Sequence, residues 1–192
     1  MYKAQMRVQK LLCFLALAAS VILFIYSLGL MTDLYDSLYP TMMNPKNIEE
    51  TWVSGSPVYY HMQGFNKTLV ALAVASVLLA LFLFVTCTHS RRRYYLGNFV
   101  STGLFAAAAA GISVFSMLRI LAFREEYLQV DFEALQSFSE MWGTPYIRST
   151  FWFDAGWFVF GLLLLAAVLL VANLIWKRKL MKEEAELLRE GE

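Results

Sequence analysis

The chain alternates four long apolar stretches with shorter polar segments. The apolar stretches run from Leu11 to Met31, Lys67 to His89, Asn98 to Phe123 and Phe153 to Trp176. Each has 20 or more residues, and at about 1.5 Å of helical rise per residue that length matches a hydrocarbon core of about 30 Å. The pattern predicts an all-α membrane protein, with one domain over residues 1–192 built as a four-helix transmembrane bundle.

The first long polar segment, residues 32–66, is interrupted by Pro40, Pro45 and Pro57, which favours turns over a long helix. We expect it to be folded onto the helix ends, because its aromatic residues are too numerous for a disordered linker. Residues 53–60 are predicted to form a short hairpin.

The second long polar segment, residues 124–152, has a different pattern. Apolar residues within VDFEALQSFSEMW recur at helical spacing, and Asp131 precedes them as an N-terminal cap. Gly143 and Pro145 follow and would end the helix. We predict an amphipathic helix on the membrane surface or over the bundle. After the last span, residues 177–192 are predicted to continue as a cytoplasmic helical tail.

Charge predicts the orientation of the chain. Eleven of the sixteen Lys and Arg residues lie in the N-terminal segment, the short turn after the second span and the C-terminal tail, and five lie in or near the two longer polar segments. Cytoplasmic segments carry the excess of cations. We therefore expect a multi-pass protein of the plasma membrane with the N-terminus and the C-terminus both cytoplasmic, and with external loops at 32–66 and 124–152.

Residues that anchor helices at the membrane surface can also be predicted. Basic and large aromatic side chains concentrate at the two interfaces of a bilayer. The candidate anchors are Arg91, Arg92, Arg93, Trp152, Trp157 and Trp176. The arginine triplet is typical of a cytoplasmic turn, so we predict no nucleic-acid binding.

The first apolar stretch has an alternative interpretation as a cleaved signal peptide. Ser27 and Gly29 provide small residues at a suitable spacing after a basic segment. The apolar run is longer than the usual core of a signal peptide. We therefore expect it to be kept as a span.

Small residues line one face of the third predicted span. Gly103, Ala107 and Gly111 are four positions apart, and small residues at this spacing let two helix backbones approach closely in lipid. The pattern predicts a helix-packing face, with a partner helix in this chain, in a second copy or in another protein.

Two charged residues fall within the predicted spans. Arg119 and Asp154 both lie near the external ends of their helices, where an unpaired charge is unfavourable. We predict an intramembrane Arg119–Asp154 charge pair. The functional alternative is that both residues line a path for a solute.

The sequence contains no recognisable catalytic signature. Its two histidines, His61 and His89, are predicted to lie on opposite sides of the membrane and cannot share a metal. Cys13 and Cys87 are expected to be small packing residues, and a contact between them is open. No CxxC, GxSxG, HExxH or phosphate-binding glycine loop occurs. We predict no catalytic, cofactor or metal site, and no enzymatic activity.

Two segments carry a resemblance to other proteins. The stretches FVTCTHSRRRYYLGN and STFWFDAGWFVFGLLLL resemble uncharacterised four-span membrane proteins of anaerobic Gram-positive bacteria. Such proteins accompany transport systems, often carbohydrate importers. The resemblance implies the same four-span fold and a transport system as partner, and it assigns no active residue.

Together these patterns predict a non-enzymatic accessory or structural subunit. Besides the lipid bilayer, its partner would be another integral membrane protein, such as a carbohydrate transporter, or a second copy of itself. The alternative is a small homo-oligomeric channel or transporter for a solute. A membrane enzyme is the third hypothesis.

Overall fold

The computed structural model describes residues 2–43, 50–88, 95–146 and 148–190. Its elements are α1 (Tyr2–Gly29), α2 (Thr32–Leu38), the 3-10 turn η1 (Tyr39–Thr41), α3 (Val58–Thr88), α4 (Tyr95–Leu128), α5 (Phe132–Trp142) and α6 (Phe151–Glu190). Within these ranges β-pairing is limited to one isolated bridge between Met42 and Thr51. The predicted all-α class is confirmed.

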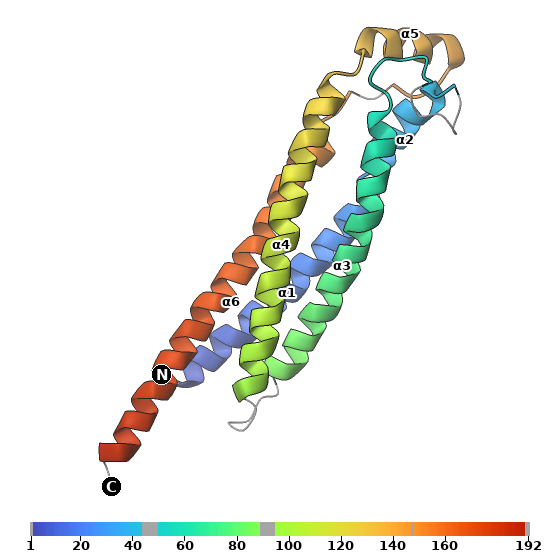
Figure 1. The fold of residues 1–192 in the computed structure, drawn as a ribbon. Coiled ribbons are helices and arrows are strands. Elements are labelled where there is room, and N and C mark those ends of the chain that lie inside the picture. The colour runs from blue at the N-terminus through green and yellow to red at the C-terminus, as the bar shows by residue number, and fades with distance from the viewer. Residues whose placement is uncertain (1, 44–49, 89–94, 147, 191–192) are drawn as a thin grey trace.

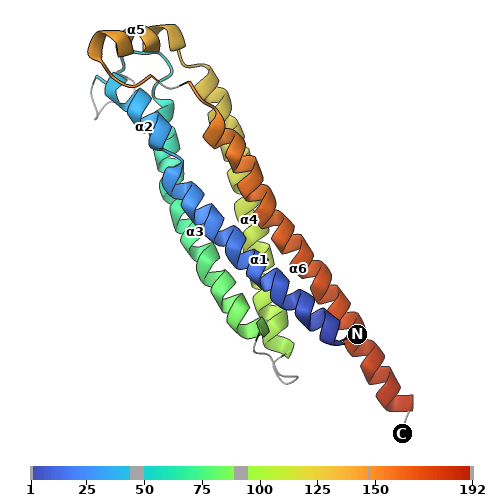
Figure 2. The same ribbon diagram turned by 180° about the vertical axis from the view of Figure 1, so that it is seen from behind.

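The four long helices form an elongated bundle with two distinct ends (Figure 1). Helix α1 packs against α3 and α6, and α4 packs against the same two helices. Going round the bundle the order is therefore α1, α3, α4, α6. Both chain ends lie at one end of the bundle, here called the termini end, and α2 and α5 lie at the other, the loop end (Figures 1 and 2).

The surface of the bundle is apolar along its length. Large side chains such as Leu11, Phe14, Leu78 and Val85 are more than half exposed, a distribution that water would disfavour and that hydrocarbon accepts. All four long helices are long and apolar enough to cross a membrane. The chain has the architecture of a multi-pass integral membrane protein.

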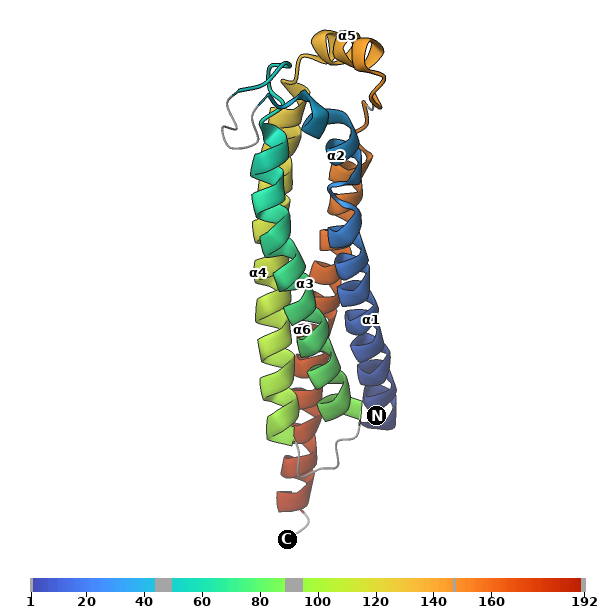
Figure 3. The same cartoon turned by 90° about the vertical axis from the view of Figure 1, so that its right-hand side faces the viewer.

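The helices are longer than a bilayer requires. Helix α6 has 40 residues, which makes it about 60 Å long. Its C-terminal part extends past the other helices at the termini end (Figure 3). Helix α3 also begins earlier than predicted, at Val58 instead of Lys67, because polar residues outside the hydrocarbon can continue a helix that the apolar run does not reveal.

The first polar segment is more helical than its prolines indicated. After Gly29 and one turn, the chain continues upward as α2 and η1. The predicted hairpin over residues 53–60 is wrong, since a turn at 53–57 leads directly into α3. The turn is built around Gly55, whose φ of 84° is easily adopted only by glycine.

The second polar segment folds as predicted. Helix α5 lies across the loop end (Figure 1), and Asp131 caps it by accepting a hydrogen bond from the backbone N–H of Ala134 at 3.0 Å. Gly143 ends it in the left-handed conformation, with φ of 64°. The buried side of α5 is formed by Leu135 and Ser139.

Candidate functional site

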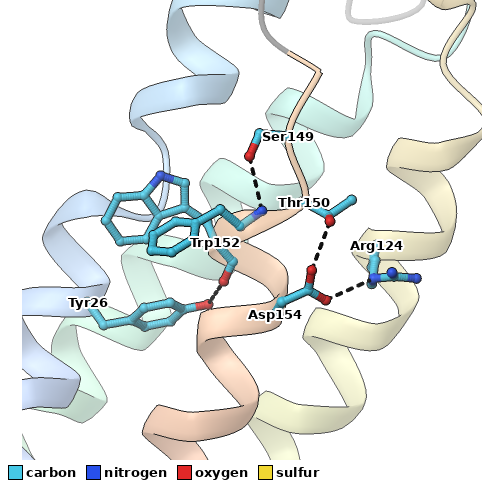
Figure 4. A network of polar contacts seen from close by, with 7 residues as sticks. Tyr26, Arg124, Ser149, Thr150, Trp152 and Asp154 are labelled. Atoms are coloured by element: carbon cyan, nitrogen blue, oxygen red, sulfur yellow. Dashed lines mark hydrogen bonds and ion pairs between the residues drawn. The ribbon is translucent and has the colours of Figure 1, made fainter.

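Asp154 pairs with Arg124 and not with Arg119. Its Oδ1 lies 3.4 Å from Arg124 Nε, and its Oδ2 accepts a hydrogen bond from Thr150 Oγ1 at 2.8 Å (Figure 4). This corrects the predicted Arg119–Asp154 pair. Positions 119 and 124 differ by about 7.5 Å in depth and by about 140° around the helix. Asp154, in the first turn of α6, lies at the same level along the bundle as Arg124, and Arg119 is too far down α4 to reach it.

The Arg124–Asp154 pair lies at the surface of the bundle. The two side chains are 36% and 56% exposed, so water screens their attraction. Asp154 also lies in the first turn of α6, where a negative charge is favoured by the positive end of the helix dipole. These contacts suit a structural role at the start of α6.

Arg119 lies in a groove between α3 and α4 near the loop end. The cavity has a volume of about 470 Å³, and the Arg119 guanidinium carbon lies 5.9 Å from the centre of the Phe115 ring. His61 Nδ1 and Glu126 Oε1, 2.5 Å apart, connect the two helices at the rim of this groove. Arg119 is exposed, and among the described residues it forms no ion pair.

The small-residue face of α4 points away from the bundle. Gly103, Ala107 and Gly111 are all exposed. A Cβ added at Gly103 or Gly111 would meet no heavy atom of the described chain within 4 Å. The residues that α4 does bury, such as Phe105 and Ala109, are two positions further along, about 200° around the helix. The predicted packing face is thus not used inside the chain.

The predicted anchors fall into three groups. Arg91, Arg92 and Arg93 lie outside the described residues. Trp157 and Trp176 are 45% and 37% exposed, and their role as interface anchors stays a prediction. Trp152 is instead half-buried and packs inward against α1.

Trp152 belongs to a close contact between α1 and α6. The Tyr26 hydroxyl donates to the backbone carbonyl of Trp152 at 2.8 Å (Figure 4). Two glycines make the approach possible: a Cβ at Gly29 would lie 2.5 Å from Cη2 of Trp152, and a Cβ at Gly156 would lie 2.7 Å from the Tyr26 hydroxyl. This contact joins the first and last spans at the loop end.

A buried polar cluster at the termini end was not predicted. The Gln5 amide donates to Gln9 Oε1 at 3.0 Å and to Asn173 Oδ1 at 3.3 Å. The Gln9 amide donates to the backbone carbonyl of Cys87 at 3.0 Å. Side chains from α1 and α6 and the backbone of α3 thus meet in one network. The sequence did contain a signal for this cluster: Gln5, Gln9 and Cys13 are four residues apart and so share one face of α1.

Lys177 lies close to this cluster and is also buried. The sequence placed it at the start of a solvated tail, but its exposed fraction is 1%. Its Nζ lies 6.0 Å from the centre of the Phe99 ring on α4. Asn173 and Lys177 are one helical turn apart, so both face the bundle interior. Lys177 is therefore part of the packed end of the bundle.

The cysteines lie in the same region, and both are buried thiols that form no disulfide within the described chain. Cys87 Sγ lies 3.7 Å from Ser101 Oγ and 3.8 Å from Thr102 Oγ1 on α4. Amide, hydroxyl and thiol groups arranged in this way hold helices together.

Across the described ranges, no three His, Cys, Asp or Glu residues are grouped as metal ligands. No protein-family model, curated protein or solved structure matches this chain.

Proposed function

We propose that the protein is a non-enzymatic accessory subunit of a membrane transport assembly, and that a partner helix binds the outward face of α4. The observation that carries the proposal is the exposure of Gly103, Ala107 and Gly111 with open space above them. Lipid gives helices no hydrophobic drive to associate, so helices attract one another through van der Waals packing, which small residues allow to be close, and through interhelical hydrogen bonds.

The shape of this face supports a helical partner. Val100, Leu104 and Val114 are exposed by 59%, 50% and 51%. At about 100° per residue, Val100 and Val114 lie before and after the small residues along the same face, and Leu104 lies to one side. A partner helix over Gly103–Gly111 would make van der Waals contact with these larger side chains at both ends of the strip and along one edge. Lipid tails fill such a shallow strip less completely than a rigid helix does.

The extension of α6 gives a second surface for a partner. Leu187 and Leu188 near its end are 71% and 67% exposed, beyond the packed bundle. We expect this segment to be cytoplasmic, where apolar side chains on a free helix favour association with another protein. The resemblance to transport-associated four-span proteins makes a transporter the proposed partner.

A photo-crosslinking experiment in native membranes tests the proposal. A photoreactive residue at Ala107 should give a protein adduct of one defined mass, identifiable by mass spectrometry. The matched position is Val168 on α6, which is 56% exposed and faces away from the packed core. Crosslinking from position 168 should give lipid adducts only.

A variant then links the adduct to the small residues. The double substitution Gly103→Leu and Gly111→Leu should abolish the adduct without lowering the thermal stability of the isolated protein, because a Cβ at either position has open space and leucine favours a helix more than glycine does. Gly161→Leu on α6, also in open space, serves as the control. Lipid adducts alone at position 107 would reject the proposal.

A homo-oligomeric solute channel is the second candidate. It is favoured by Arg119, which is exposed near the loop end of the same helix and forms no ion pair with any other described residue. In that case the adduct at position 107 would have the mass of two copies of this chain. Solute flux into vesicles would also fall on Arg119→Gln substitution while the dimer persisted.

A further inference from the structure

A second groove lies at the loop end, between α1–α2 and α3, on the opposite side of α3 from Arg119. Its volume is about 680 Å³. The lining changes in character along the helix axes: Leu28 and Val70 form its apolar end, and Tyr35, Asp36 and Lys67 lie toward the loop end. The groove therefore has an apolar end and a polar end, in the same way that a lipid has an apolar chain and a polar headgroup.

The two charged residues of this groove have opposite signs. Asp36 and Lys67 are both exposed, and neither forms an ion pair within the described parts of the chain. They come from different walls, α2 and α3. A ligand that carries both a cation and an anion would compensate both charges at once.

The order of the charges along the groove is defined by the helix positions. The rings of Tyr35 and Tyr59 are 6.2 Å apart, which places Tyr35 and its neighbour Asp36 level with Tyr59. Lys67 is eight residues further along α3 and so lies about 12 Å nearer the apolar end. From the apolar end outward, the groove presents aliphatic side chains, then a cation, then an anion.

Tyr35 adds an aromatic surface beside Asp36. Its ring is stacked on Tyr39, with centres 5.1 Å apart and an angle of 8° between the planes, and it remains 53% exposed. Tyr59 contacts both rings, so the three rings pack as one group. An aromatic ring next to a carboxylate attracts an ammonium group.

Asn66 indicates that a hydrogen-bond donor is missing from this wall. It lines the groove, and its Oδ1 is buried without a hydrogen-bond partner among the described residues. Buried acceptors are nearly always satisfied. A ligand in the groove that carries an N–H or O–H donor near Lys67 would satisfy this oxygen, so Asn66 supports an occupied groove and does not distinguish one headgroup from another.

We propose that this groove binds a phospholipid whose headgroup carries a primary ammonium, with its acyl chain along Leu28 and Val70, its phosphate at Lys67 and its ammonium between Tyr35 and Asp36. This sequence of groups in the lipid matches the sequence of side chains in the groove. The proposal does not depend on the function proposed for α4, which lies on another face of the bundle.

Native mass spectrometry of the detergent-purified full-length protein tests the proposal. With equimolar phosphatidylethanolamine and phosphatidylglycerol, the wild type should bind the former about tenfold more, the ratio expected when one charge-assisted hydrogen bond distinguishes two ligands. Asp36→Asn should bring the ratio close to one. Asp33→Asn, three residues earlier on α2 and outside this groove, should leave it unchanged.

The phosphate contact is tested separately. Lys67→Gln should reduce binding of both lipids by a similar factor, while Arg148→Gln, whose guanidinium lies over Phe132 and away from the groove, should not. Equal binding of the two lipids by the wild type, or the same loss in the Asp33 and Asp36 variants, would overturn the proposal. Displacement of the lipid by equimolar soluble phosphoethanolamine would also overturn it, because the chains would then contribute nothing.

Discussion

The Gln5 side chain donates a hydrogen bond to Asn173 Oδ1 at 3.3 Å, which joins the first helix to the last across 168 positions of sequence. Both residues are buried at the termini end. Because Gln5 also bonds to Gln9, which in turn bonds to the backbone of α3, two neighbouring amides of α1 connect three helices. This network is a buried polar connection between α1, α3 and α6 that contains no charge pair.

Replacing Asn173 should therefore loosen this end of the bundle. We expect Asn173→Leu to lower the free energy of unfolding by about 1 kcal/mol, within the range found for interhelical hydrogen bonds in membranes. Denaturation in lipid bicelles would measure it. Val171→Ala, an exposed position in the same turn, is the control, and an equal loss there would contradict the assignment.

The contact of Gly29 with Trp152 gives a steric prediction. Gly29→Ala places a methyl group where the indole already lies, 2.5 Å from its Cη2, and should cost about 1–3 kcal/mol of stability. Thermal unfolding in detergent would measure the change. The double variant Gly29→Ala with Trp152→Leu should recover part of the loss, whereas Gly161→Ala, in open space, should not destabilise.

The Arg124–Asp154 pair predicts a small coupling. A double-mutant cycle with Arg124→Gln and Asp154→Asn should give an interaction energy of about 0.2–1 kcal/mol, because both side chains are exposed. The corresponding cycle with Arg119→Gln should give none. A larger coupling between Arg119 and Asp154 would show that α4 and α6 pack in a different register.

The orientation of the bundle is also testable. Because both termini lie at one end and α5 at the other, a cysteine at Ser137 and one at Glu186 should label from opposite sides. From the distribution of Lys and Arg we expect Ser137→Cys to react with an impermeant maleimide in intact cells and Glu186→Cys only after permeabilisation. The native cysteines are buried and give little background. The reverse labelling pattern would show that the termini lie outside the cell and α5 inside.

The bundle could be predicted from sequence because lipid imposes a simple rule: about 20 apolar residues for each crossing. The α5 helix could be predicted because Asp131 and Gly143 are local signals. The sequence could not predict which residues of neighbouring helices contact each other. Arg119 and Arg124 are chemically alike, and only the register of α4 against α6 decides which one reaches Asp154.

The same limit applies to small and polar residues. The spacing of Gly103, Ala107 and Gly111 predicts close packing, but it cannot say that the partner lies outside the chain. Asn173 lies within the last apolar run and Lys177 just beyond it, and the apolar pattern does not reveal a partner for either. Asn173 is buried against Gln5 of α1 and Lys177 against Phe99 of α4, and these contacts depend on how the whole bundle packs.

The order of the helices around the bundle keeps the two proposed binding sites apart. Helix α4 is diagonal to α1, so a neighbour seated on Gly103–Gly111 would not cover the Tyr35 groove. A lipid in the Tyr35 groove and a partner helix on α4 can therefore be bound at the same time. The number of lipids bound per chain carries no information about whether the partner is bound.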